Sequence, residues 1–185
     1  MTLRYFRENG LLVLETDRLV LREQSPAAAA VLAEGDTAGL DWLDAAPGSG
    51  TQIAAKMVTM AAEAGAYLPG WGLFVIQRAG DGVALGGIGF HGPPSEGTVE
   101  IGYDLTESAR GAGWATDAVI ALTRWTLRLP AVDTVLATTD PGNLPSQRVL
   151  LRAGFTRRAD LDGLWAYELT AEPTSPLPGS PAAAR

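Results

Sequence analysis

Hydrophobic and polar positions recur along the chain with two different periods, which predict a mixture of helices and strands. Segments with helical spacing end at residues that stop helices, such as Gly65 and Pro130. Ser25 and Pro26 supply an N-cap and a first-turn proline for the first of them. The pattern predicts four helices, over residues 27–33, 53–64, 113–129 and 145–153.

Runs with alternating or β-branched residues separate these helices and predict strands. The predicted strands span residues 19–22, 73–76, 83–90, 99–105, 134–139 and 164–169, and a turn at Gly80 to Gly82 joins the second and third into a hairpin. In the fourth strand, one face carries Val99, Ile101, Tyr103 and Leu105, and the other carries Glu100, Gly102 and Asp104. Helices alternating with strands around a hairpin predict a mixed α/β sheet.

The length of 185 residues fits one domain, which we place at residues 1–170. The remaining segment, 171–185, is rich in Pro and Ala and is predicted to be a disordered tail. The net charge is −7 and the basic residues are scattered, so nucleic acid is not expected as a partner. No apolar stretch is long enough to span a membrane, and a cytoplasmic location is expected.

The residue inventory excludes several kinds of catalysis. The chain has no cysteine and one histidine, which excludes disulfides, cysteine nucleophiles and metal sites built from thiolates or imidazoles. A serine triad would need His91, and no Gly-x-Ser-x-Gly sequence occurs. No metal is expected, and catalysis must rest on carboxylates, hydroxyls and the backbone.

The loop between the strand that ends at Leu105 and the next helix has the composition of an anion site. Its sequence is Arg110-Gly111-Ala112-Gly113-Trp114-Ala115, and Thr116 follows in the first helical turn. Two glycines let backbone N–H groups point the same way, while the helix dipole and an arginine add positive charge. A pyrophosphate is the expected ligand, with a plain structural turn as the alternative. The loop lacks the Lys-Ser/Thr ending and the third glycine that are typical of ATP and NAD sites.

Arg110, Gly113 and Ala115 match the signature of the GNAT superfamily of acyl-CoA N-acyltransferases, which the chain resembles. Further segments resemble the subgroup named for acetylating N-terminal alanines of ribosomal proteins: Thr16–Arg22, Glu100–Tyr103, Asn143–Ser146 and Ala153–Phe155. The resemblance covers about Leu14 to Leu169. Several motifs in the right order are more specific than any one of them.

This resemblance implies a mixed, mostly antiparallel sheet that is splayed between its fourth and fifth strands and flanked by about four helices. The pantetheine of acetyl-CoA would lie in the gap, paired with the backbone of Tyr103 and Leu105. The diphosphate would contact residues 110–116, and Asn143 would be a further cofactor contact. Gly102 lies where a bulge would splay the sheet, as expected for a glycine inside an alternating run.

The resemblance also implies catalytic residues. Glu100 stands where related GNAT enzymes carry a general base, a role that needs its pKa raised by burial. A solvated or salt-bridged sheet residue is the alternative. Many GNAT enzymes use a tyrosine acid at the position of Leu150, so the usual candidate is missing here. The subgroup instead offers Ser146 to protonate the thiolate, with a helix cap as its alternative role.

Three further residues have two interpretations each. His91 lies in a loop, either beside the acceptor or simply solvated. Trp42 and Trp71 either line an acceptor pocket or belong to the core, whereas Trp125 fits the apolar stripe of its helix.

The sequence therefore predicts an enzyme that moves acetyl from acetyl-CoA to a primary amine by direct attack, without an acyl-enzyme. The acceptor would be a small molecule or a protein N-terminus, and the protein a monomer or homodimer. The alternatives are a non-catalytic acyl-CoA-binding module and a phosphate-binding domain of nucleotide type.

Overall fold

The structure is a computed structural model that describes residues 2–171, so the predicted tail lies outside the described residues except for Ala171. In this part of the chain nine strands form one sheet, in the order β1-β2-β3-β4-β5-β6-β7-β9-β8. The strands are β1 (Arg4–Glu8), β2 (Leu11–Glu15), β3 (Leu19–Glu23), β4 (Leu73–Arg78), β5 (Ala84–Phe90), β6 (Thr98–Leu105), β7 (Thr134–Thr139), β8 (Thr156–Arg157) and β9 (Trp165–Thr170). The helices are α1 (Pro26–Ala33), α2 (Ser49–Glu63), α3 (Trp114–Thr126) and α4 (Leu144–Arg152), with a short 3₁₀ helix η1 (Glu107–Ala109) before α3.

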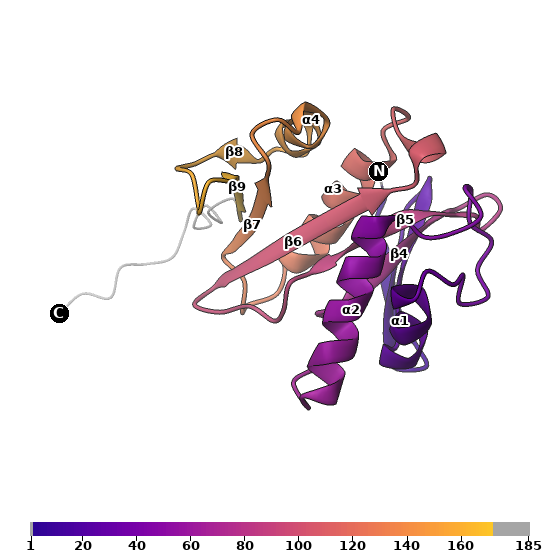
Figure 1. The fold of residues 1–185 in the computed structure, drawn as a ribbon. Helices are drawn as coiled ribbons and strands as arrows, with labels where there is room; N and C mark the ends of the chain where they lie inside the picture. Colours follow the sequence, from indigo (N-terminus) through magenta and orange to yellow (C-terminus); the bar gives the residue numbers. More distant parts are fainter. Residues whose placement is uncertain (1, 172–185) are drawn as a thin grey trace.

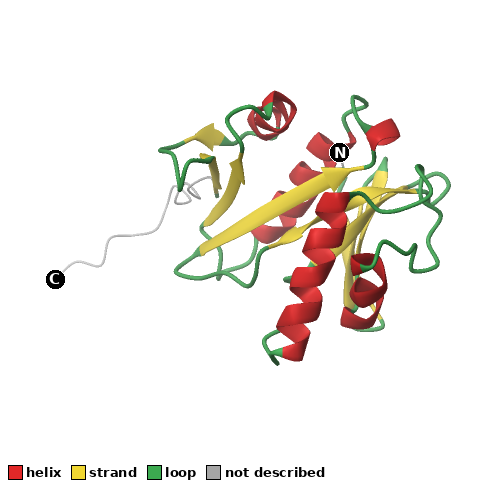
Figure 2. Ribbon diagram, viewed as in Figure 1, coloured by secondary structure: helices red, strands yellow, loops and turns green. Residues whose placement is uncertain are grey.

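The helices cover both faces of the sheet (Figures 1 and 2). Helices α1 and α2 pack together on one face, where α2 contacts β4, β5 and β6. Helix α3 packs on the opposite face against β2, β3 and β6, and α4 lies beside it. The apolar stripe of α3 is buried there, which confirms Trp125 as a core residue.

All four predicted helices and all six predicted strands are confirmed. The Ser25 side chain accepts a hydrogen bond from the backbone N–H of Ala28 at 3.1 Å, as expected of an N-cap. Three strands were not predicted, namely β1, β2 and the two-residue β8. The first two form a hairpin that extends the sheet beyond β3.

Trp42 lies in the core between the sheet and α1 and α2, and it is 4% exposed. Its indole Nε1 donates to the carbonyl of Thr37 at 3.1 Å. Of the two interpretations of Trp42, the core one is confirmed. The interpretation that it lines an acceptor pocket is wrong, because the ring is buried among core side chains.

The sheet is splayed where the sequence predicted, between the fourth and fifth predicted strands, which are β6 and β7. Strand β6 pairs antiparallel with β5 through Leu105, but it pairs with the parallel strand β7 only over residues 98–100. Beyond Glu100 the two strands move apart (Figure 1).

The bulge expected at Gly102 is not present. Gly102 pairs with Gly89, and its neighbours Ile101 and Tyr103 pair with Phe90 and Ile88, with no shift in register. The glycine has another role, because a Cβ at this position would lie 2.9 Å from Nε2 of His91. It makes room for an imidazole ring rather than bending the strand.

A buried carboxylate ties the N-terminal hairpin to the rest of the sheet. Glu23 is 1% exposed, and its Oε2 accepts a hydrogen bond from the backbone N–H of Leu12 at 2.7 Å. Its Oε1 accepts from the Tyr67 hydroxyl at 3.0 Å and from the backbone N–H of Gly70. One side chain therefore joins β2, β3 and the loop after α2.

Replacing Glu23 by Ala is expected to lower the free energy of unfolding by about 3 kcal/mol, because buried donors lose a charged acceptor. Denaturant unfolding of both proteins measures the difference. The matched control is Glu34→Ala at an exposed helix end, with an expected change below about 0.5 kcal/mol. Equal losses in the two variants would contradict this role for Glu23.

Candidate active site

Both glycines of the glycine loop adopt backbone conformations that glycine favours. Gly111 and Gly113 have φ angles of 82° and 85°, in the left-handed region that favours glycine. Gly113 is the N-cap of α3, and no side chain in the described part of the chain caps this helix. The first N–H groups of α3 are thus left for an anion.

Arg18, at the turn before β3, contacts this loop and the first turn of α3. Its guanidinium donates to the carbonyl of Ala112 at 3.3 Å and forms an ion pair with Asp117 in the first turn of α3. It also stacks on the Trp114 ring, 4.3 Å from the ring centroid. Arg18 belongs to a motif that the sequence highlighted, but no local pattern linked it to a loop 94 residues away.

Arg110 lies at the entrance to the gap between β6 and β7. Its Nε and Nη2 donate to the carbonyl of Leu105 at 3.1 and 3.0 Å, and Nη2 lies 3.7 Å from Oδ1 of Asp104. The side chain is 64% exposed, so the charge remains open to an anion at the loop. The Leu105 carbonyl thus accepts hydrogen bonds from the Arg110 side chain.

A cleft of about 490 Å³ opens between the end of β6, the glycine loop and α4. It brings together seven of the predicted site residues: Tyr103, Leu105, Arg110, Gly111, Ala115, Asn143 and Ser146. The end of β6 therefore borders a cavity that reaches the N-terminus of α3.

Two hydroxyl groups meet across this cleft. The Tyr103 hydroxyl lies 2.8 Å from Oγ of Ser146, and it also donates to the Ser146 carbonyl at 3.2 Å. Burial raises the pKa of Tyr103 to about 12, so the phenol is neutral at physiological pH. Asn143 caps α4, since its side chain accepts from the backbone N–H of Ser146 at 3.2 Å.

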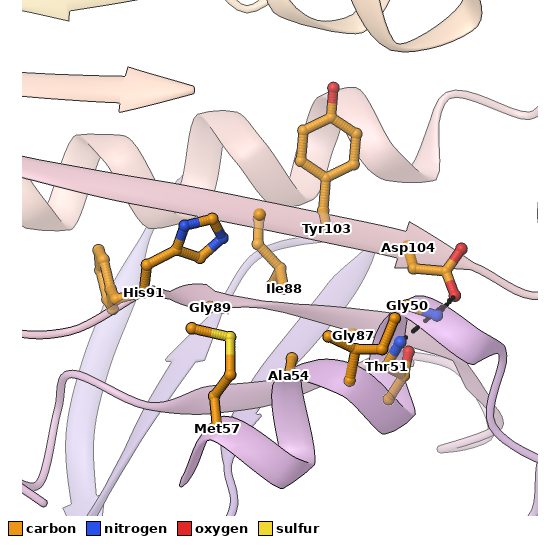
Figure 3. A pocket seen from close by; sticks show the side chains of 13 residues that line it. Gly50, Thr51, Ala54, Met57, Gly87, Ile88, Gly89, His91, Tyr103 and Asp104 are labelled. Carbon is orange, nitrogen blue, oxygen red and sulfur yellow. Dashed lines mark hydrogen bonds between the residues drawn. The ribbon is translucent and has the colours of Figure 1, made fainter. Parts of the chain in front are cut away.

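A second cavity, of about 200 Å³, lies on the other side of β6, beneath α2. Figure 3 shows Met57 and Ala54 of α2 facing His91 across it, while the side chains of Tyr103 and Ile88 point away from α2. Tyr103 and Asp104 line both cavities. Both cavities therefore border the end of β6.

Asp104 joins β6 to the N-terminus of α2. Its Oδ2 accepts from the backbone N–H groups of Gly50 and Thr51 at 3.0 and 3.4 Å (Figure 3). A Cβ on Gly50 would lie 2.6 Å from that of Asp104, so only glycine permits this approach. Gly50 in the first turn of α2 thus has a structural role, which is to let Asp104 approach the helix N-terminus.

His91 and Glu100 form a pair at the edge of the second cavity. Nδ1 of His91 lies 3.3 Å from Oε2 of Glu100, and Oε1 accepts from the Thr138 hydroxyl at 2.8 Å. The hydrogen bond with His91 is the main reason that the pKa of Glu100 is lowered, and burial only partly opposes it. A general base at this position would need its pKa raised by burial, and Glu100 does not meet that condition.

Trp71 lies close to this pair. It packs edge-on against Phe90, with ring centroids 4.9 Å apart, and it lines a small cavity of about 40 Å³ together with His91. Its predicted place beside an acceptor thus remains open, in contrast to Trp42.

Within residues 2–171, no group of three or more His, Cys, Asp or Glu side chains is placed to hold a metal ion. No helix in that range is long and apolar enough to cross a membrane.

The sequence of residues 18–156 matches the family described as "Acetyltransferase (GNAT) domain". The chain belongs to the GNAT acetyltransferase family. Its GNAT features are the ones built above, namely the splayed strands β6 and β7 and the glycine loop that precedes α3.

Known GNAT proteins are similar in sequence and fold. The uncharacterized N-acetyltransferase YjdG of Bacillus subtilis (strain 168) is 33% identical over 87 residues, which cover 46% of this chain and 52% of that protein. The chain thus matches about half the length of this relative. An acetyltransferase from Agrobacterium tumefaciens str. C58 has a TM-score of 0.59 and 26% identity, over 91% of this chain and 98% of that one. Mycobacterium smegmatis RimJ, solved in complex with CoA-disulfide, has a TM-score of 0.58 and 20% identity, over 91% and 87% of the chains.

Replacing Arg18 by Gln is expected to make the glycine loop more mobile, because Ala112, Trp114 and Asp117 lose the side chain that contacts all three. Amide hydrogen exchange of residues 111–116 should speed up about fivefold, while global stability changes by less than about 1 kcal/mol. The control is Arg4→Gln, which removes an ion pair whose arginine is 75% exposed. Unchanged exchange in the loop of the Arg18 variant would contradict this role.

Proposed function

We propose that the protein transfers acetyl from acetyl-CoA to a primary amine by direct attack of the amine on the thioester. The observation that carries this proposal is the position of the two cavities, which meet at Tyr103 and Asp104 from opposite sides of β6. An amine held in one can reach a thioester held in the other without any covalent intermediate on the protein. Membership of the GNAT family supports this reaction.

The larger cleft is the proposed site of acetyl-CoA. The diphosphate would bind the N–H groups of Gly111 to Thr116, where α3 has no side-chain cap, with Arg110 adding charge. The pantetheine would pass between β6 and α4, beside the backbone of Tyr103 and Leu105 and the side chain of Asn143. That RimJ was solved with a CoA-disulfide supports a coenzyme A ligand in this fold.

The thiolate that leaves needs a proton, and Ser146 is its proposed source. Ser146 lines the cleft and is hydrogen-bonded to the Tyr103 phenol, which is held neutral by burial. A proton given up by Ser146 can be replaced through this hydroxyl pair. Backbone N–H groups of β6 beyond its pairing with β7 would stabilise the oxyanion.

The smaller cavity is the proposed site of the acceptor, and its lining limits the acceptor's chemistry. Most of its walls are apolar: Ile53, Ala54, Met57, Ile88 and Phe90. Among the described residues that line it, Asp104 is the only carboxylate, and that group is engaged by the N-terminus of α2 and by Arg110. An amine on a small apolar group fits this surface better than a polyamine or an aminoglycoside, whose extra cations would find no acidic partner.

Phenethylamine is therefore expected to be acetylated with a kcat/KM about tenfold or more above that of spermidine, because the extra ammonium groups of spermidine lose hydration without a partner. Release of free thiol from acetyl-CoA measures both rates. Ala54→Glu should shift the preference toward spermidine, and Ala54→Gln should not. A wild-type preference for spermidine would overturn the proposed acceptor and leave acetyl transfer standing.

A carboxylate introduced into the glycine loop should weaken coenzyme A binding. Ala112 is exposed and its N–H lies between the two glycines, so Ala112→Glu places negative charge beside the diphosphate without straining the backbone. Calorimetry should show an affinity for coenzyme A at least about tenfold lower than that of the wild type. Ala112→Gln, which matches the size without the charge, should bind nearly normally.

Two outcomes would count against the proposed function. If the Glu and Gln variants at Ala112 bind coenzyme A equally well, the diphosphate does not lie at this loop. If the wild-type protein binds acetyl-CoA but releases no thiol with any primary amine tested, the chain is a non-catalytic acyl-CoA-binding module.

A further inference from the structure

We propose that His91 is the group that takes the proton from the attacking amine, and that Glu100 acts through it as a positioning residue. This inference rests on the proposed acetyl transfer and adds to it a catalytic group. It also reassigns Glu100, which the sequence indicated as the base itself.

The contacts of Glu100 show where its carboxylate points. One oxygen faces Nδ1 of His91 at 3.3 Å, and the other accepts from the Thr138 hydroxyl on β7 at 2.8 Å. The two residues are also joined through the backbone, because the N–H of His91 donates to the Glu100 carbonyl at 3.0 Å. Since a carboxylate can only accept, Nδ1 carries the proton in the neutral imidazole, and Nε2 keeps its lone pair.

The free nitrogen faces the acceptor side of β6. Nε2 lies directly over Gly102, where a Cβ would come within 2.9 Å of it. His91 lines both the proposed acceptor cavity and the cavity of about 40 Å³ next to it. It lies at the edge of the space shown in Figure 3. Among the described residues that line these two cavities, Glu100 does not appear, so a bound amine meets the imidazole first.

The charges around His91 come from few groups. Tyr103 and Asp104 line the proposed acceptor cavity together with His91, and Tyr67 lines the cavity of about 40 Å³ with it. Asp104 is already paired with the N-terminus of α2 and with Arg110, and burial raises the pKa of Tyr67 and of Tyr103, so both remain neutral. The hydrogen bond with Glu100 is the main cause that raises the pKa of His91 above 6.5, against a smaller effect of burial.

The proton transfer balances as follows. The amine nitrogen forms a bond to the thioester carbonyl carbon and gives one proton to Nε2 of His91. The carbon–sulfur bond then breaks, its electron pair leaves on sulfur, and the thiolate takes a proton from Ser146, which solvent restores. The imidazolium returns its proton to solvent, so that amine and acetyl-CoA give amide and free coenzyme A.

The first test uses the fact that His91 is the only histidine in the chain. In untagged protein, the imidazole proton signals in an NMR titration belong to this residue alone, and their midpoint should lie above 6.5. Glu100→Gln should move the midpoint to lower pH, because the imidazolium loses its anionic partner. The matched control, Glu63→Gln at an exposed position on α2, should leave it in place.

The second test measures acetyl transfer to the fastest amine among phenethylamine, spermidine and an alanine-initiated peptide. The wild-type kcat should rise with pH as His91 loses its proton, since only the neutral imidazole is a base. His91→Gln should lower kcat about 100-fold or more and leave coenzyme A affinity within about twofold. Glu100→Gln should lower kcat by less and shift the rising limb to lower pH, in step with the NMR midpoint.

The outcomes separate this inference from the proposed function. If the wild-type protein transfers acetyl and His91→Gln keeps its kcat, the role of His91 is overturned while acetyl transfer stands. If Glu100→Gln abolishes transfer but leaves the NMR midpoint unchanged, Glu100 acts directly and not through His91. If the wild-type protein acetylates no amine, the proposed function fails first.

Discussion

The short pairing between β6 and β7 is the constraint on which the site depends. Two parallel strands hold together over residues 98–100 only, so the sheet is anchored at one end and open at the other. Backbone groups that face such a gap need partners, and an extended chain laid between the strands can supply them. The open end leads to the N-terminus of α3, which is why a molecule with an extended arm and a diphosphate fits both features at once.

Strand alternation then divides the chemistry between two faces. Tyr103 and Asp104 are neighbours in the chain, yet their side chains point to opposite sides of β6 (Figure 3). Tyr103 reaches across the cleft to Ser146, whereas Asp104 points to α2 and accepts hydrogen bonds from its N-terminus, beside the cavity beneath α2. A register shift of one residue in β6 would place each side chain on the opposite face of the sheet. The unbroken pairing with β5 prevents such a shift.

Local patterns predicted the parts of the structure that local physics determines. The two glycines before α3 form the turn before a helix that the sequence predicted, and Ser25 caps α1 as expected. The splay itself came from the family resemblance. The hairpin β1 and β2 was missed because β1 is exposed along its whole length and so lacks the alternation that marks a half-buried strand.

The remaining differences come from contacts between segments that are distant in sequence. The alternating pattern of its strand predicted a bulge at Gly102. Only the position of His91 shows that the missing Cβ makes room for an imidazole ring. No local pattern distinguishes Glu23, but donors from β2 and from the loop after α2 converge on it. Arg18 contacts the glycine loop in the same way, through the fold and not through the chain.

The two faces of β6 also solve a problem that acyl transfer to an amine poses. The nitrogen must lose a proton while the sulfur gains one, and a single group placed between them would have to act first as a base and then as an acid within one turnover. In the arrangement proposed here, His91 offers a lone pair on the side of the cavity beneath α2, and a pair of neutral hydroxyls lies on the cleft side. Because the strand separates them, neither group competes for the other's proton, and each needs only to be tuned to one transfer. The carboxylate of Glu100 serves this division best where it is found, behind the imidazole and out of reach of the amine.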